Sequence, residues 1–257
     1  MAQLNEDALR KLDNDLQGYI PQISINLVIF RFNGEALEVP GVLVGDKNSW
    51  TIPGGFIDQS ENLEDAARRI LKEQIGSEKL LLKQFGCFGN TSRNFGAEIE
   101  NFTNHQLPNS IIDWFSRRFI TIGYYTVAPP ELKILNASPL FFSTKWVCVK
   151  DTNTLALDHA NLVNEALKIL RSDLLSKPLL IDFLPDSFTI PELQKLYEAI
   201  LGRTVDRGNF RQRMLKQNIL TKLGVTKKKT SRRPPILYTL NKQEYLKSLT
   251  EDIKLGF

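Results

Sequence analysis

The sequence has little of several features that mark special classes of protein. Two cysteines are too few for a disulfide framework or a cysteine-rich zinc site. The two histidines, His105 and His159, do not form a metal-binding spacing, so we expect no metal site. No apolar run approaches the roughly 18 residues of a membrane-spanning helix, and the charged start of the chain lacks the apolar region of a secretory signal. We therefore expect a cytoplasmic protein with no membrane partner.

What the chain does contain is enough apolar residues for an ordinary core. Of its 257 residues, 42% are hydrophobic and 24% are charged, which is typical of a globular protein. This composition excludes wholesale disorder and collagen-like structure. The length fits one large domain or two small ones.

Charge is distributed unevenly along the chain. Residues 203–234 contain eleven Lys or Arg and a single acid, Asp206, which gives a local charge of +10 within an overall charge of +4. The rest of the chain therefore carries −6. This asymmetry favours a polyanion-binding module joined to a mildly acidic domain. The alternative is a solvated basic face with no binding role.

The first part of the sequence alternates strand patterns with helical ones. Helical spacing of apolar residues predicts helices at 60–76 and 158–175, and Asn33-Gly34 predicts a hairpin turn. We expect residues 1–178 to form one α/β domain. The strands of this domain are predicted at residues 24–32, 38–45, 50–57, 79–90 and 119–129.

The last quarter of the chain has the pattern of a winged helix-turn-helix. A capping box begins at Thr189, and Gly202 ends the helix that follows. A second helix begins at Asp206 as N-cap and runs to about Leu220, after a three-residue connection that is typical of a helix-turn-helix. The next segment reads as a two-stranded ribbon with a basic tip. We expect residues 179–257 to form a DNA-binding domain.

The second helix of this module carries donors suited to base recognition. At 100° per residue, its long polar side chains gather opposite the apolar Phe210 and Met214. In the major groove of double-stranded DNA, Arg can bond guanine at two atoms, and Asn or Gln can do the same with adenine. The basic tip of the ribbon suits phosphate contacts. The residues that we expect to bind DNA are Arg207, Asn209, Arg211, Gln212, Arg213, Lys216, Lys227, Lys228, Lys229, Arg232 and Arg233.

Two alternatives to DNA binding are a structural helical subdomain and an RNA-binding module. RNA modules usually stack bases on exposed aromatic side chains. The basic segment has only Phe210 and Tyr238, and both occupy apolar positions. The pattern therefore favours DNA over RNA.

The segment GGFIDQSENLEDAARRILKEQIG, residues 54–76, resembles the Nudix box. The box has the pattern G-x5-E-x7-R-E-U-x-E-E-x-G-U, in which U is an aliphatic residue. The resemblance implies a Nudix-like α/β/α sandwich with a mixed sheet. The framework positions that match are Gly55, Glu61, Arg69, Leu71, Glu73 and Gly76.

Three positions depart from the box. Ile70 and Gln74 stand where the family has glutamates, and Ser77 replaces the final aliphatic residue. Nudix hydrolases hold divalent cations with these glutamates. Isoleucine offers no ligand and glutamine only a neutral amide, so the departures imply that hydrolysis is lost and that there are no catalytic residues. The alternative is a Mg²⁺-dependent pyrophosphatase that acts on nucleoside diphosphate derivatives through Glu61 and Glu73.

The remaining sequence extends the resemblance to the Nudix-related transcriptional regulators, the NrtR-like group. Residues 184–215 are similar to that family's FTL-x-ELQ-x-LYE-x-ILG segment followed by DRRNFRRK, and RRPPILYTL is similar to its wing strand. The resemblance implies a homodimeric repressor or activator that binds a small effector, and we expect no cofactor. Family members regulate NAD metabolism in response to ADP-ribose-type nucleotides, or sugar utilisation in response to a pentose.

Three residues are candidates for the effector pocket: Trp50, Phe56 and Arg93. An aromatic ring can cover a sugar face, and an arginine can bond hydroxyls or phosphate. The alternative is that the aromatics belong to the core and that Arg93 is a solvated loop residue. The loss of metal-binding carboxylates favours a neutral sugar over a pyrophosphate. The insertion at 94–116 either covers the pocket or joins a dimer interface.

Overall fold

The chain folds into two compact units. The first comprises residues 1–30, 38–126 and 133–166, and the second comprises 31–37, 127–132 and 167–257. None of the helices in the described ranges is long and apolar enough to cross a membrane. The structure is a computed structural model that describes residues 6–44, 49–76, 80–96, 107–134, 141–176, 183–225, 234–241, 243–245 and 247.

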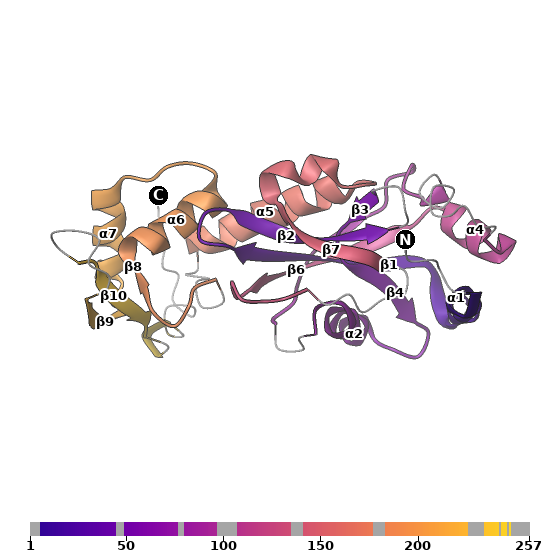
Figure 1. Ribbon diagram of the computed structural model, residues 1–257, viewed down its shortest axis with the longest axis horizontal. Coiled ribbons are helices and arrows are strands. Elements are labelled where there is room, and N and C mark those ends of the chain that lie inside the picture. Colours follow the sequence, from indigo (N-terminus) through magenta and orange to yellow (C-terminus); the bar gives the residue numbers. More distant parts are fainter. Residues whose placement is uncertain are drawn as a thin grey trace. The chain divides into compact units, whose positions relative to one another are not determined.

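A sheet of seven strands is the framework of the first unit (Figure 1). Its strands are β1 (Tyr19–Phe32), β2 (Leu37–Val44), β3 (Ser49–Thr51), β4 (Gly54–Asp58), β5 (Lys83–Phe88), β6 (Ile120–Ala128) and β7 (Phe141–Cys148). The order is β3-β2-β1-β6-β5, with β4 also paired to β1 and β7 to β2. The apolar run at 25–30 in β1 is almost fully buried, as expected of a central strand.

The sheet confirms most of the predicted strands and corrects two points. The segment at 50–57 forms two strands, β3 and β4, because the chain turns at Pro53, which has no amide hydrogen for a sheet. Strand β7 was not predicted, since FFSTKWVC lacks strict alternation of apolar and polar residues. The predicted hairpin turn is confirmed: Gly34 has φ 98°, and the Asn33 side-chain oxygen accepts bonds from the amides of Glu35 and Ala36 at 2.9 Å.

Two helices confirm the predicted helical segments and cover opposite faces of the sheet. Helix α2 (Leu63–Ile75) ends at Gly76 in the left-handed conformation and packs Ile70 against the backbone of Gly55. Helix α5 (His159–Ser176) follows the 3-10 helix η1 (Val149–Thr154). Its first turn lies on the other face. Ile25 of β1 pairs with Gly55 on the α2 side, so the next side chain, Asn26, points away from α2 and bonds Arg93, the ion-pair partner of Asp158 directly before α5.

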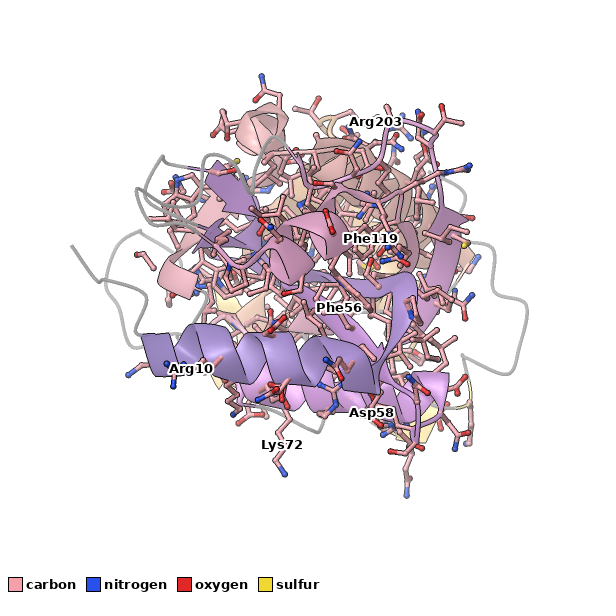
Figure 2. The ribbon with its side chains drawn as sticks, turned by 90° about the vertical axis from the view of Figure 1, so that its right-hand side faces the viewer. Arg10, Phe56, Asp58, Lys72, Phe119 and Arg203 are labelled. Carbon is pink, nitrogen blue, oxygen red and sulfur yellow. The ribbon has the colours of Figure 1, made fainter. Side chains whose placement is uncertain are left out.

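Two helices that were not predicted enclose an aromatic cluster. They are α1 (Glu6–Gly18) and α4 (Asn109–Ser116), which lies within the insertion expected to be a polar loop. The cluster joins Leu16 of α1 to Phe115 of α4, and Phe56 and Phe119 pack within it with ring centroids 5.9 Å apart. Figure 2 shows both rings inside the molecule behind α1. The described end of the insertion is therefore part of the core of the first unit.

The second unit is a winged helix. Helix α6 (Ile190–Leu201) has the predicted capping box, and α7 (Arg207–Lys216) begins after Asp206 as predicted. A small sheet has the order β8-β10-β9, from β8 (Phe188–Thr189), β10 (Ile236–Leu240) and β9 (Leu220–Val225). Helix α7 ends earlier than the predicted Leu220, because that residue already begins β9.

The two units divide within α5. Residues of α5 up to 166 belong to the first unit and its later residues to the second, where Arg171 donates to the carbonyl of Ile200 at 2.7 Å. This contact with the last turn of α6 explains why the end of α5 belongs to the same unit as the winged helix. The division differs from the predicted domain boundary after residue 178, which placed all of α5 in the first domain.

Replacing Phe210 with alanine should destabilise the second unit strongly. Its ring is 1% exposed and meets Tyr197 edge-on, with centroids 5.1 Å apart. We expect the free energy of unfolding to fall by about 3–5 kcal/mol, because a large buried side chain is lost. Chemical denaturation measures this. Leu223→Ala is the control, since Leu223 is 57% exposed and its loss should change stability by roughly 0.5 kcal/mol or less. Equal effects of the two changes would contradict the packing described.

Candidate nucleic-acid interface and small-molecule site

Helix α7 presents one buried and one exposed face. Phe210 and Met214 are buried, and the Asp206 side chain accepts a hydrogen bond from the Asn209 amide at 2.8 Å, which fixes the start of the helix. All six of its predicted DNA-binding residues are exposed: Arg207, Asn209, Arg211, Gln212, Arg213 and Lys216. The helix therefore has the geometry to present a row of donors to a groove.

A hydrogen-bond network that the sequence did not reveal holds the turn between α6 and α7. One carboxylate oxygen of Glu198 accepts from the Val205 amide at 2.9 Å and from the Gln194 side chain at 3.1 Å. Gln194 also donates to the Val205 carbonyl at 3.1 Å. Both polar groups of the Val205 backbone are thus satisfied, and the angle between the two helices is set by side chains of α6.

The basic tip of the wing lies outside the described residues, so the structure does not place Lys227, Lys228, Lys229, Arg232 or Arg233. On the described part of the wing, Lys222 of β9 is exposed. It was not among the predicted residues, although it lies within the strongly basic segment.

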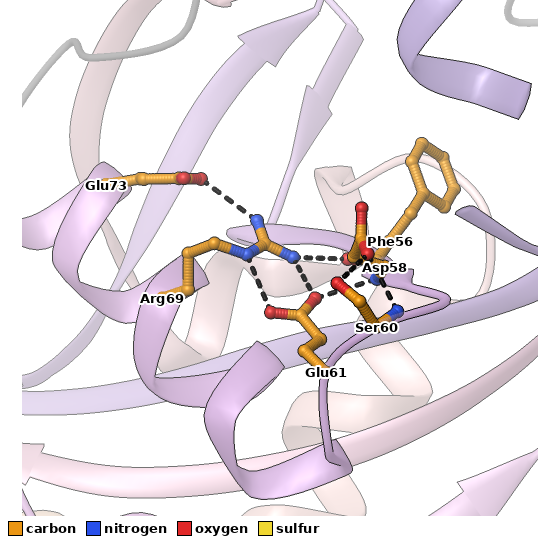
Figure 3. A network of polar contacts seen from close by, with 6 residues as sticks. All are labelled: Phe56, Asp58, Ser60, Glu61, Arg69 and Glu73. Atoms are coloured by element: carbon orange, nitrogen blue, oxygen red, sulfur yellow. Dashed lines mark hydrogen bonds and ion pairs between the residues drawn. The ribbon is translucent and has the colours of Figure 1, made fainter. Parts of the chain in front are cut away.

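The Nudix-box segment contains an ion-pair network centred on Arg69 (Figure 3). The guanidinium donates to both carboxylate oxygens of Glu61, at 3.0 and 2.5 Å, and to Glu73 at 3.3 Å. It also donates to the Phe56 carbonyl at 2.8 Å. Glu61 accepts a further bond from the Asp58 amide at 2.7 Å. The network holds the loop before α2 against the helix.

This network lowers the pKa of Glu61. The main cause is hydrogen bonding from the Arg69 side chain, which favours the charged carboxylate. The pKa of Arg69 is raised in turn by Glu61. Both acids of the box are therefore bonded to one arginine, whose single positive charge balances one of their two negative charges.

The two positions that lack the family's glutamates have structural contacts of their own. Ile70 is buried, and its branch atoms lie so close to Gly55 that a β-carbon there would approach within 2.9 Å. Gln74 is also buried, and its amide bonds both backbone groups of Gly54, accepting from the nitrogen at 3.2 Å and donating to the oxygen. Both side chains thus join α2 to β4.

The residues present do not fit a divalent cation site. Of the three helix positions that would converge on a metal, Ile70 has no ligand atom, Gln74 is bonded to backbone, and Glu73 is paired with Arg69. In the part of the chain that the structure describes, there is no cluster of three or more His, Cys, Asp or Glu that could hold a metal.

The three predicted effector residues occupy different surroundings. Lys145 lies 3.8 Å above the Trp50 ring, which also covers Gly41. Phe56 contacts the rings of Trp114 and Phe115 in the aromatic cluster, so its contacts fit the core alternative. A role of these residues in binding an effector stays a prediction.

Arg93 lies in a buried polar cluster of the first unit. It is only 3% exposed, which rules out the alternative of a solvated loop residue. Its guanidinium forms an ion pair with Asp158 and donates to the Asn26 side chain at 3.0 Å. The Thr121 hydroxyl donates to the same Asn26 oxygen at 2.8 Å. Burial lowers the pKa of Arg93 to about 10, so it remains charged at neutral pH.

His159 completes this cluster at the start of α5. Its Nδ1 accepts a hydrogen bond from the Ile52 amide at 3.3 Å, which leaves the proton of the neutral ring on Nε2. Burial, together with the charge of Arg93, lowers the pKa of His159 to about 3. One clue to the cluster is visible in the sequence, a polar Asn26 within an apolar strand. None is visible for His159, which stands apart from any recognisable spacing.

Two family models match adjoining parts of this chain. Residues 21–166 match the NUDIX domain, and residues 180–240 match the NrtR DNA-binding winged helix domain. The chain is a member of the NUDIX family that carries an NrtR winged helix. The predicted resemblance and the predicted fold class are therefore confirmed.

Similar proteins cover nearly the whole chain. The ADPR responsive transcriptional repressor NtrR of Acinetobacter baylyi is 26% identical over 235 residues, 88% of this chain and 84% of the relative. Shewanella oneidensis NrtR complexed with a 27mer DNA superposes with a TM-score of 0.64 at 25% identity, covering 88% of this chain and 96% of that one. A MutT/nudix family protein from Enterococcus faecalis shares the fold, with a TM-score of 0.60 at 21% identity over 93% and 94% of the two chains.

Replacing Glu61 with glutamine should destabilise the protein at neutral pH but not in acid. A lowered pKa in the folded state means that Glu61 contributes stability above its ordinary pKa and loses it as pH falls through the lowered value. We expect a loss of about 1–2 kcal/mol at pH 7 that shrinks as pH falls below about 4 and vanishes once Glu61 is protonated in the folded state as well. Unfolding at a series of pH values measures it. Glu73→Gln, at a more exposed ion pair, should cost roughly 0.5 kcal/mol or less. A pH-independent loss for Glu61→Gln would contradict the assignment.

Proposed function

We propose that this protein is a transcriptional regulator whose NUDIX domain binds a small effector and thereby changes the affinity of the winged helix for its operator. The observation that carries the proposal is the surface of α7. Six hydrogen-bond donors of this helix are exposed, its opposite side is buried in the core, and hydrogen bonds hold the turn before it. The NrtR winged helix match and the DNA complex of the Shewanella relative support the same function. The proposed base-reading residues are Asn209, Gln212, Arg213 and Lys216, with Arg207, Arg211 and the wing on phosphates.

The effector that we propose is ADP-ribose or a pentose sugar. The Acinetobacter relative is an ADPR responsive repressor, which supports the nucleotide. The absence of a metal-binding carboxylate set on α2 supports recognition of the sugar part over a metal-bound pyrophosphate. We propose Arg93, with Trp50 and Phe56, as effector residues.

Helix α5 is the proposed route between effector and DNA. Its first residue, His159, lies in the polar cluster, and Arg171 on the same helix bonds the last turn of α6 in the second unit. A movement of the first turn of α5 would therefore displace α6, whose side chains hold the turn before α7. In a homodimer, which we also propose, two α7 helices would reach major grooves one helical turn apart, so a small change weakens binding.

We further propose that the chain does not hydrolyse nucleoside diphosphate compounds. Ile70 and Gln74 replace two metal-binding glutamates and are committed to packing against β4. Glu61 and Glu73 are both bonded to Arg69. The competing function, a Mg²⁺-dependent pyrophosphatase, would have to assemble a metal site from these two acids.

Arg213→Ala should reduce sequence preference, whereas Lys228→Ala should not. The DNA for this test is selected by the full chain from a random duplex pool at near-physiological salt. Arg213→Ala should cost about 1–3 kcal/mol on the selected duplex and much less on a scrambled one, and Lys228→Ala should weaken both alike. Fluorescence anisotropy measures the affinities. Unchanged preference in Arg213→Ala would show that α7 does not read the bases through this face.

The purified protein should release no product from ADP-ribose or other nucleoside diphosphate sugars with Mg²⁺ or Mn²⁺, because only two box acids remain and both are bonded to Arg69. Phosphate-coupled assays and chromatography measure it. Metal-dependent turnover that is abolished in Glu73→Gln would establish the pyrophosphatase and refute the loss of hydrolysis.

A further inference from the structure

The polar cluster of the first unit has more hydrogen-bonding groups than partners. Within the described residues, Ser24 Oγ, Arg93 Nε and His159 Nε2 are buried and have no hydrogen-bond partner. The three residues are 5%, 3% and 2% exposed. Buried polar groups are nearly always satisfied by protein, water or ligand, so three orphans in one cluster need an occupant.

These three groups belong to one neighbourhood. Arg93 bonds Asn26, whose neighbour on the same face of β1 is Ser24, and the single hydrogen of the Thr121 hydroxyl is within reach of the Asn26 side-chain oxygen at 2.8 Å and the Ser24 carbonyl at 3.2 Å. His159 adjoins Asp158, the ion-pair partner of Arg93. The side of the cluster open to solvent is at Asp158, whose side chain is 27% exposed against 1% for Arg93.

The three buried groups without hydrogen-bond partners would be satisfied by neutral oxygen atoms of a ligand. Arg93 Nε and His159 Nε2 are donors, and the Ser24 hydroxyl can donate or accept. The charge of Arg93 is already balanced by Asp158, and the ring of His159 is neutral. A phosphate would add uncompensated negative charge beside Asp158, which is unfavourable where water is excluded. Hydroxyl oxygens satisfy the donors without this penalty.

The aromatic cluster adjoins the donors. Ser24 pairs across the strands with Phe56, so their side chains share a face of the sheet. The Phe119 amide donates to the Arg93 carbonyl at 2.9 Å, and its ring packs on Phe56. A few polar groups beside a packed apolar wall are typical of a small-molecule site.

We propose that this cluster binds the hydroxyls of a neutral polyol, either the ribose of ADP-ribose or a free pentose, with Ser24, Arg93 and His159 as its polar contacts. The inference rests on the proposed function, because it specifies the part of the effector that enters the first unit. Asp158, directly before α5, then senses the occupant through its ion pair with Arg93.

Isothermal titration of the full chain tests this with ADP-ribose, D-ribose, L-arabinose and inorganic pyrophosphate as probes. Ser24→Ala should weaken polyol binding about fivefold, because one hydrogen bond to the ligand is lost. The ligand-free variant should melt at the same temperature as the wild type or higher, since an unsatisfied buried hydroxyl is removed. Ser110→Ala, which removes an exposed hydroxyl bonded to Asp13, is the matched control and should leave affinity unchanged.

His159→Asn separates a binding role from a packing role. Asparagine keeps an acceptor near the position of Nδ1 for the Ile52 amide but has no group in place of Nε2. We expect polyol binding to weaken about tenfold with little change in melting temperature, whereas His159→Gln, which can reach the Nε2 position, should retain more affinity.

The outcomes distinguish the two proposals. Wild-type affinity for polyols in Ser24→Ala and His159→Asn would overturn the polyol site and leave effector sensing intact, with ordered water satisfying the cluster. Binding of pyrophosphate but not of the pentoses, unaffected by either variant, would overturn it in the same way. No binding of any probe to the wild type would overturn effector sensing and the polyol site together.

Discussion

The buried charge of Arg93 is the constraint on which the arrangement of the first unit depends. A guanidinium removed from water must be neutralised and hydrogen-bonded by the protein, or the fold loses several kcal/mol. Asp158 supplies the opposite charge and Asn26 the hydrogen bond. These partners come from the segment before α5 and from the central strand β1. One side chain thus fixes the start of α5 relative to the sheet.

The Nudix box also depends on the pairing of an arginine with acidic side chains, and this pairing gives it a structural role. Arg69 joins Glu61 and Glu73, and it anchors the loop before α2 through the Phe56 carbonyl. Helix α2 is joined to β4 by two further side chains: Ile70 packs against it, and the Gln74 amide forms hydrogen bonds with its backbone. In this arrangement the side chains of α2 hold it against the sheet, and the proposed effector site lies on the opposite face of the sheet.

Local patterns predicted the elements whose causes are local. The buried run of β1, the capping box at Thr189 and the left-handed glycines at 76 and 202 follow from residue type and spacing. Helices α1 and α4 could not be recognised in this way, because α4 has only eight residues and the apolar side chains of the two helices, such as Leu16 and Ile111, find their partners only in the aromatic cluster of the folded protein.

The candidate site shows the same limit. The exposed donors of α7 could be predicted from helical periodicity, and the contacts of Ile70 and Gln74 agree with their departure from the box pattern. The polar cluster could not be assembled, because Asn26, Arg93 and Asp158 are far apart in sequence and meet only in the folded sheet. Arg93 alone was singled out, and its burial and partners came from the structure.

The central claim is that one chain couples a small molecule to DNA through α5. The most direct measurement is the affinity of the full chain for a duplex selected from a random pool, with and without saturating ADP-ribose and, separately, pentose. The account predicts that one of these ligands changes the affinity at least fivefold, and that DNA changes the affinity for that ligand by the same factor. Equal DNA affinities with a ligand demonstrably bound would contradict the coupling.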